Sequence, residues 1–234
     1  MADEERRSVA VVTGAGRGIG RAIAVRLAAG GHHVVAAART AAEVEATAAL
    51  GRDIDAVVAD VGSGVGVDSI AAAADRAGRL DVWVNNAAIL ERRAFVELDP
   101  ATWDRTMDVN LRGAYLGCRA AFSRMAASSG GVIVNIGSLS GVAGVEKFAG
   151  LSAYNVSKAG LIALTEAVAV EGRDHLVRCV ALSPGAVDTE MLRRAAPHLN
   201  PGMTPDDVAA IVTFLISADA AHLSGVNIPI FSNR

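Results

Sequence analysis

Short runs of β-branched and other apolar residues alternate along the chain with longer segments of helical spacing. Several of these runs consist almost entirely of valine, isoleucine and alanine, which is typical of parallel strands buried on both faces. The expected strands are Val9–Thr13, His33–Ala37, Ile54–Ala59, Asp81–Asn85, Val132–Ile136, Val177–Leu182 and a seventh at Val226–Ile230. The expected helices are Gly18–Gly30, Ala41–Leu50, Val67–Ala77, Thr102–Ala127, Tyr154–Gly172 and Pro205–Ala218.

Strands that alternate with helices in this way form βαβ units. The sequence therefore predicts an α/β fold, a Rossmann-type doubly wound three-layer sandwich with a mostly or wholly parallel seven-stranded sheet. A length of 234 residues suits one domain, and no linker or repeat divides residues 1–234. Ligands of such folds bind beyond the carboxyl ends of the strands. We therefore expect the chemistry directly after Thr13, Ala38, Ala59, Asn85, Ile136 and Leu182.

Composition narrows the class of function. The net charge of -3 and the 4% of aromatic residues argue against a nucleic-acid binder. The two cysteines, Cys118 and Cys179, form no CxxC motif, and the five histidines show no ligand spacing, so we expect no metal site. No apolar run approaches a membrane span, and the first residues, MADEERR, lack the apolar core of a signal peptide. These features favour a cytoplasmic enzyme or binding domain.

A glycine-rich segment, TGAGRGIG, follows the first expected strand and opens the first expected helix. Glycines allow the backbone to approach a pyrophosphate closely, and the helix N-terminus offers free N–H groups. The alternative is a tight turn that binds nothing. The strand, turn and helix in this order favour a dinucleotide site formed by Gly14, Gly16, Arg17, Gly18, Ile19 and Gly20.

Arg39 follows the second strand, near the place where such folds read the ribose of the cofactor. A carboxylate there would bind the 2′-hydroxyl of NAD, whereas a guanidinium suits a 2′-phosphate. Arg17 offers a second positive charge. The sequence therefore predicts NADP(H), with NAD(H) as the less favoured cofactor; the alternative is that both arginines are solvated surface residues.

Tyr154 and Lys158 lie four residues apart at the start of an expected helix, which places them on one face. A nearby ammonium lowers the pKa of a phenol, and such a tyrosine can exchange a proton with a carbonyl or alcohol oxygen. The motif alone is weak, because chance produces it easily.

Together these motifs, with others spread over almost the whole chain, resemble the short-chain dehydrogenase/reductase family in its single-domain branch. By this resemblance, Tyr154 looks like the catalytic acid/base, and Lys158 looks like its partner, which also binds the nicotinamide ribose. Ser138 resembles the serine that binds the substrate carbonyl. Asn110 resembles the residue that holds a water molecule of the proton relay. The matching segments are TGAGRGIG at 13–20, Asp60-Val61, Asn85-Asn86-Ala87-Ala88, Asn110, Asn135-Ile136-Gly137-Ser138, Tyr154 with Lys158, and Pro184-Gly185-Ala186-Val187-Asp188-Thr189.

The resemblance also assigns cofactor contacts. Asp60 and Val61 look like adenine contacts, Asn86 and Ala87 line the adenosine side, and the nicotinamide contacts are Pro184, Gly185, Val187 and Thr189. For Asn86, a structural tie of its strand is an equal alternative. Ser140 competes with Ser138, which is favoured because it directly ends a strand.

Two variable segments bear on the substrate. Residues 190–204 resemble a substrate lid, in which Arg193 and Arg194 either meet an anionic substrate or, as we favour, lie on a solvated surface. The tail 224–234 lacks the Asp-Gly-Gly ending common in the family, which puts its part in the pocket and in subunit contacts in doubt.

The sequence thus predicts an NADP(H)-dependent oxidoreductase that transfers a hydride between the nicotinamide and a small carbonyl or secondary alcohol. The alternatives are a 3-oxoacyl thioester reductase of the acyl-carrier-protein type and a non-catalytic protein that senses the dinucleotide. Resemblance further implies a homodimer or homotetramer.

Overall fold

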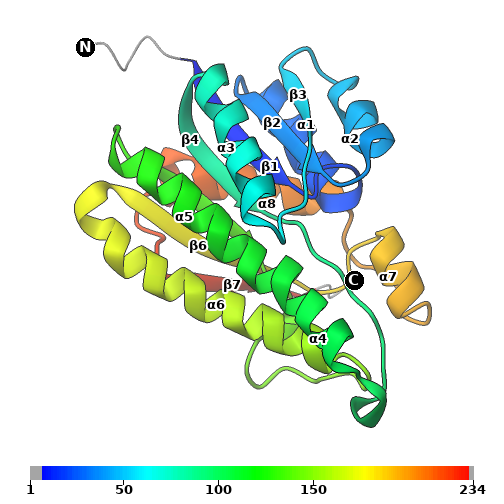
Figure 1. Cartoon of the computed structure of the whole chain (residues 1–234). Coiled ribbons are helices and arrows are strands. Elements are labelled where there is room, and N and C mark those ends of the chain that lie inside the picture. Colours follow the sequence, from blue (N-terminus) through cyan, green and yellow to red (C-terminus); the bar gives the residue numbers. More distant parts are fainter. Residues whose placement is uncertain (1–6, 232–234) are drawn as a thin grey trace.

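The chain folds around one sheet of seven parallel strands. The structure, a computed structural model, describes residues 7–231 (Figure 1), so residues 1–6 and 232–234 of the expected domain lie outside the described part. The strands run in the order β3-β2-β1-β4-β5-β6-β7, and all neighbouring pairs are parallel. Their bounds are β1 Ser8–Thr13, β2 His33–Ala38, β3 Ile54–Val58, β4 Arg79–Asn85, β5 Gly131–Ile136, β6 Val177–Pro184 and β7 Val226–Ile230. The predicted fold class is confirmed, with a wholly parallel sheet.

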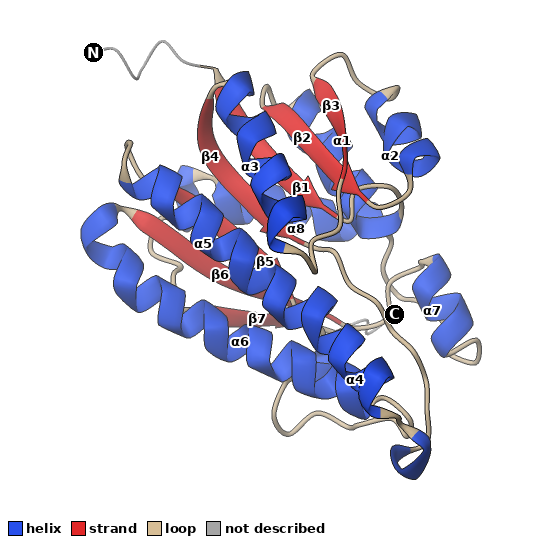
Figure 2. Cartoon of the chain, in the orientation of Figure 1, coloured by secondary structure: helices blue, strands red, loops and turns tan. Residues whose placement is uncertain are grey.

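Helices cover both faces of the sheet (Figure 2). Successive strand side chains point to opposite faces, so each strand contributes to two apolar cores. Val12 and Val34 pack with helices α1 (Gly18–Ala29) and α8 (Pro205–Ile216). Val11 and Val35 belong to the other core, which includes side chains from α3 (Gly64–Ala77), α5 (Gly113–Ala126) and α6 (Ser152–Gly172). This two-faced burial explains why the strands read as nearly continuous apolar runs.

The order of the strands creates one crevice. From β1 the chain builds the sheet outward through β2, helix α2 (Ala41–Ala48) and β3, and it then returns to the other side of β1 with β4. The crossovers after β1 and β4 therefore leave in opposite directions. Such a reversal opens a crevice at the carboxyl ends of the two strands, where this class of fold binds its ligands.

The helix expected over residues 102–127 is interrupted. Helix α4 (Pro100–Met107) begins at the cap residue Asp99, whose Oδ1 accepts a 2.9 Å hydrogen bond from the backbone N–H of Thr102. A π-helical turn, η2 (Asp108–Arg112), then joins α4 to α5. This turn contains Asn110, which is buried. Wider turns of this kind are frequent at functional sites, and periodicity alone does not reveal them.

Helix α7 (Glu190–Ala195) forms within the segment expected to be a lid. The Oγ1 atom of its cap residue, Thr189, accepts a hydrogen bond from the backbone N–H of Leu192, yet α7 has no fully buried side chain. Four short 3-10 turns complete the described part: η1 Phe95–Glu97, η3 Leu139–Gly141, η4 Arg173–His175 and η5 Ala218–Ala220. Among residues 7–231, no helix has the length and apolar character needed to cross a membrane.

Candidate active site

A cavity of about 930 Å³ opens at the carboxyl edge of the sheet, between the turn after β1 and helix α7. All the site residues expected from the sequence line it, with the exception of Asn110. They come from widely separated segments: Gly14, Gly16, Arg17, Gly18, Ile19, Gly20, Arg39, Asp60, Val61, Asn86, Ala87, Ser138, Tyr154, Lys158, Pro184, Gly185, Val187 and Thr189. The fold therefore brings the proposed cofactor and catalytic residues to one cleft.

The glycine turn fits a dinucleotide. Gly14 has a φ of +65°, and a Cβ atom on Gly20 would lie 2.3 Å from the carbonyl oxygen of Gly14, so only glycine suits this close turn. Helix α1 begins directly behind it, and its cap residue Arg17 gives no side-chain hydrogen bond to the first turn. Exposed backbone donors at a helix N-terminus suit the pyrophosphate of a nicotinamide dinucleotide.

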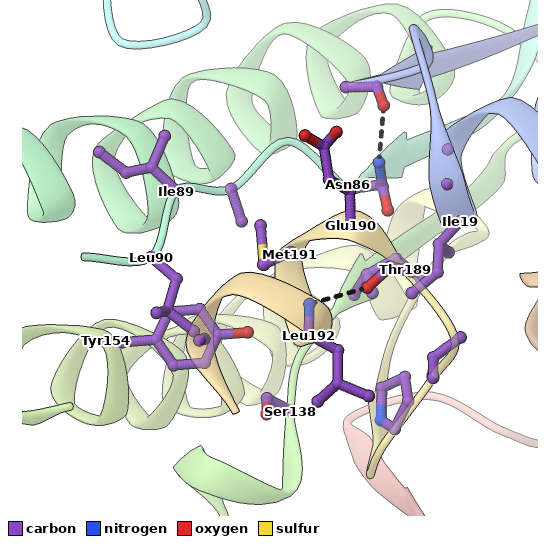
Figure 3. Close-up of a pocket in the computed structure, with 18 of the residues that line it drawn as sticks. Ile19, Asn86, Ile89, Leu90, Ser138, Tyr154, Thr189, Glu190, Met191 and Leu192 are labelled. Atoms are coloured by element: carbon purple, nitrogen blue, oxygen red, sulfur yellow. Dashed lines mark hydrogen bonds between the residues drawn. The ribbon is translucent and has the colours of Figure 1, made fainter. Parts of the chain in front are cut away.

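Asn86 holds this turn in place (Figure 3). Its Nδ2 atom donates hydrogen bonds to the carbonyl oxygens of Thr13, at 2.9 Å, and Gly14, at 3.2 Å. Its backbone N–H donates to the Oγ1 atom of Thr13 at 3.0 Å. Asn86 thus ties β1 to β4 and also lines the cleft, so the two roles left open by the sequence do not exclude each other.

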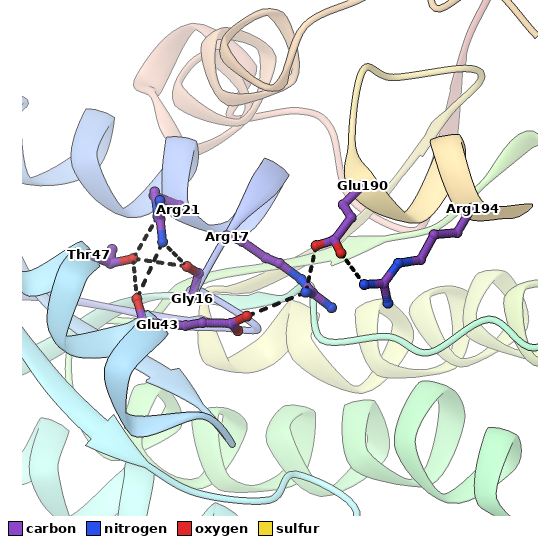
Figure 4. A network of polar contacts seen from close by, with 7 residues as sticks. All are labelled: Gly16, Arg17, Arg21, Glu43, Thr47, Glu190 and Arg194. Atoms are coloured by element: carbon purple, nitrogen blue, oxygen red, sulfur yellow. Dashed lines mark hydrogen bonds and ion pairs between the residues drawn. The ribbon is translucent and has the colours of Figure 1, made fainter. Parts of the chain in front are cut away.

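The two candidate phosphate-binding arginines differ in their partners (Figure 4). Arg17 Nη1 lies 2.7 Å from Glu190 Oε2 on α7 and 3.4 Å from Glu43 Oε1 on α2. Arg39 is exposed at the end of β2 and has no ion pair or hydrogen bond to the described residues. Glu43 and Glu190 were missed in the sequence, because nothing in the spacing indicates that they meet Arg17.

The proposed catalytic hydroxyls meet where β5 ends and α6 begins. Tyr154 lies in the first turn of α6, and Ser138 follows β5. Burial raises the pKa of the Tyr154 phenol, while a hydrogen bond with the side chain of Ser138 opposes part of this rise. The lowering expected from the nearby ammonium is therefore wrong for this site, because burial has the larger effect. Ser140 also lines the cleft, but its backbone N–H donates to Ser138 Oγ at 3.2 Å. This geometry favours Ser138 over Ser140 as the partner of Tyr154.

Lys158 lies beneath the phenol ring. Its Nζ atom is 5.7 Å from the centre of the Tyr154 ring and donates a 2.6 Å hydrogen bond to the carbonyl oxygen of Ile136. The side chain is almost fully buried, and burial lowers the pKa of Lys158 to about 8. The ammonium is therefore held beside the phenol by the last residue of β5.

Asn110 acts behind the cleft. Its Oδ1 accepts a hydrogen bond from the backbone N–H of Ile89 at 2.8 Å, and its Nδ2 donates to the carbonyl oxygen of Ile89 at 2.9 Å. Nδ2 also donates to Ser157 Oγ at 3.1 Å, and Ser157 Oγ donates to the carbonyl oxygen of Tyr154 at 2.8 Å. Asn110 thus ties the loop after β4 to the turn of α6 that carries Tyr154, and its water-holding role stays a prediction. The contribution of Ser157 was missed in the sequence.

The burial of Lys158 leads to a prediction about stability and pH. Because the pKa of Lys158 falls from 10.5 to about 8 on folding, the unfolded chain binds this proton more readily in that range, so folding stability rises with pH. In chemical denaturation, the free energy of unfolding of the wild type should rise between about pH 7.5 and about pH 9.5 by about 2 kcal/mol more than that of Lys158→Met. Lys147→Met, at an exposed lysine, is the control that should follow the wild type. If the free energy of unfolding depended on pH in the same way in Lys158→Met and the wild type, the shifted pKa of Lys158 would be contradicted.

Comparison with known proteins identifies the family. A family model described as short chain dehydrogenase matches residues 8–200. The chain belongs to the short-chain dehydrogenase/reductase family. It is 38% identical to 2-(R)-hydroxypropyl-CoM dehydrogenase of Xanthobacter autotrophicus, over 93% of this chain and 94% of that protein. It is 32% identical to levodione reductase of Leifsonia aquatica, over 95% of this chain and 92% of that protein.

A solved structure agrees with this assignment. The 3-ketoacyl-(acyl-carrier-protein) reductase from Brucella melitensis, complexed with NADH, superposes with a TM-score of 0.88 at 32% identity, over 97% of this chain and 98% of that chain. The short-chain dehydrogenase/reductase described here is thus an oxidoreductase that uses a nicotinamide dinucleotide on hydroxyl or carbonyl groups.

Proposed function

We propose that this short-chain dehydrogenase/reductase is an NADP(H)-dependent ketone reductase and secondary-alcohol dehydrogenase. One observation carries the proposal. The glycine turn, the unpaired Arg39 and the cluster of Ser138, Tyr154 and Lys158 all face the same cleft. A regulator that only sensed the dinucleotide would not need the three catalytic side chains.

The cluster accounts for the proton chemistry. A bound nicotinamide dinucleotide supplies the hydride to a carbonyl carbon, or accepts it in the reverse direction. Ser138 and Tyr154 donate hydrogen bonds to the carbonyl oxygen, on which negative charge builds. Because burial raises its pKa, the Tyr154 phenol is protonated at neutral pH and can give its proton to that oxygen. The Lys158 ammonium then stabilises the phenolate that remains.

Arg39 supports NADP(H) as the cofactor. Its guanidinium is exposed at the carboxyl end of β2, lines the cleft and makes no ion pair or hydrogen bond with any described residue. A free guanidinium at this place suits a phosphate monoester. Arg17 is less available, since Glu190 and Glu43 already neutralise it.

The oxidation of NADPH and NADH by a panel of ketones, diketones and 3-oxoacyl thioesters tests both parts of the proposal. The wild type should prefer NADPH. Arg39→Ala should raise the KM for NADPH by about 10- to 100-fold, the usual strength of a hydrogen bond to a charged group, with little effect on NADH. Arg76→Ala, at an exposed arginine of α3 outside the cleft, is the control.

Two outcomes would contradict the proposal. If Arg39→Ala raised the KM for NADPH and for NADH equally, or if the wild type preferred NADH, the assignment of NADP(H) as the cofactor would be rejected. Tight binding of the dinucleotide with no turnover of any carbonyl would instead favour a sensing protein.

We also propose that the protein is a cytoplasmic homodimer or homotetramer. Tyr115 on α5 and Val156 on α6 are about half exposed in the single chain, and Val170 on α6 is more exposed still. Assembly across these helices would cover them, which supports the proposal. Light scattering at micromolar concentration that gave the mass of one chain would refute it.

A further inference from the structure

The substrate end of the cleft is mostly apolar. Apolar side chains line the cleft from the loop after β4, from the segment before α6, from α7 and the residues that follow it, and from the residue after β7. Figure 3 shows Leu90, Met191 and Leu192 among them, together with Tyr154. Those that form the wall are Leu90, Leu151, Met191, Leu192, Leu199 and Phe231. Such a wall binds a substrate by burying its apolar surface.

The two lid arginines are neutralised within the lid itself. Arg193 lines the cleft but forms an ion pair with Asp188, and Arg194 forms an ion pair with Glu190 (Figure 4). An anionic substrate would therefore meet arginines whose positive charge a neighbouring carboxylate already neutralises.

Two more basic side chains near this end hold the backbone. Arg92 donates from Nε to the carbonyl oxygen of Ala149 at 3.1 Å, and from Nη1 to that of Ala195 at 3.2 Å. Lys147 donates from Nζ to the carbonyl oxygen of Val142 at 2.6 Å. The bonds of Arg92 join the end of α7 to the segment before α6, and neither Arg92 nor Lys147 lines the cleft.

Carboxylates outnumber basic groups on the lid side of the cleft. Glu146, Asp188 and Glu190 line it there, against Arg17 and Arg193, which pair with Glu190 and Asp188. Glu146 is exposed and has no ion pair with the described residues. A carboxylate on the substrate would lose its hydration and face the unpaired negative charge of Glu146.

We infer that this site selects a neutral, largely apolar ketone or secondary alcohol, and that Glu146 and the Asp188–Arg193 pair exclude anionic substrates. This inference rests on the proposed ketone reductase function and names its class of substrate. Glu146 and Asp188 are then specificity-determining residues, since they act on the far end of the substrate rather than on the reacting carbonyl.

Pairs of ketones that differ only in the charge of one substituent test this inference. Each pair has a carboxylate and the primary carboxamide of the same shape, for example 4-oxocyclohexanecarboxylate and its carboxamide, with one linear and one aromatic pair beside it. With NADPH, the wild type should show a kcat/KM at least about tenfold higher for the carboxamide. Glu146→Gln and Asp188→Asn should each lower this ratio about three- to fivefold, because one removes a negative charge and the other frees Arg193.

Asp68→Asn, which removes an exposed carboxylate of α3 outside the cleft, should leave the ratio unchanged. The ratio is compared within each variant, so a change in stability or in cofactor binding acts on both members of a pair. A wild type that uses the carboxylate as well as the carboxamide, or a ratio that neither variant moves, would overturn the inference and leave the ketone reductase function intact. Failure of all pairs with both NADPH and NADH would overturn the proposed function itself.

Discussion

Replacing Tyr154 with phenylalanine should lower the turnover number at least about 100-fold, the usual contribution of a general acid. The substitution removes the phenol that would protonate the carbonyl oxygen but keeps the ring that lies over Lys158. The dissociation constant of the dinucleotide should therefore stay within about twofold of the wild type, since the glycine turn and Arg39 are untouched. Steady-state kinetics and quenching of NADPH fluorescence measure the two quantities.

The chain contains a matched control for this substitution. It has two tyrosines, and the other one, Tyr115, is about half exposed on α5 and does not line the cleft. Tyr115→Phe should keep wild-type turnover. Near-normal turnover in Tyr154→Phe would show that Tyr154 is not the group that transfers the proton.

The second large effect is expected at Gly20. A Cβ atom there would lie 2.3 Å from the carbonyl oxygen of Gly14 and 2.4 Å from Nδ2 of Asn86, and the first of these is backbone that cannot simply turn away. Gly20→Ala should therefore displace the turn, lower folding stability by about 1–3 kcal/mol and weaken dinucleotide binding at least about 100-fold. Thermal unfolding and titration with NADPH would show both losses.

Gly64 provides the control for this alanine. It is the first residue of α3, and a Cβ atom on it would meet nothing within 4 Å. Gly64→Ala should leave binding unchanged and raise stability by up to about 1 kcal/mol, because alanine loses less chain entropy than glycine in a helix. If Gly20→Ala binds NADPH as tightly as Gly64→Ala does, the glycine turn is not the dinucleotide site.

The sequence predicts most of the sheet because burial on both faces leaves a strong local pattern. Residues 9–12 are buried apolar side chains at each position, and the contact of Gly20 with the carbonyl oxygen of Gly14 requires glycine within the turn itself. Tyr154 and Lys158 are also found locally, since a helix sets their spacing. These features need no knowledge of distant segments.

The features that the sequence did not predict depend on distant segments or on small changes of geometry. Arg17 and Glu190 are 173 residues apart, so their ion pair exists only in the folded chain. The π-helical turn at Asn110 has the composition of an ordinary helix, and it was predicted as part of one. Phe231, in a tail whose role was left in doubt, lines the cleft because β7 ends beside β6.

The shallow packing of α7 has a consequence for how this protein can change over evolutionary time. Because the helix has no fully buried side chain, new residues can be tried there at small cost to the seven-stranded scaffold. The candidate catalytic residues, in contrast, follow β5 or lie on α6, and both of these elements contribute buried side chains to a core. A descendant of this chain could therefore acquire a different range of substrates through substitutions in one short helix, while its catalytic residues stayed the same.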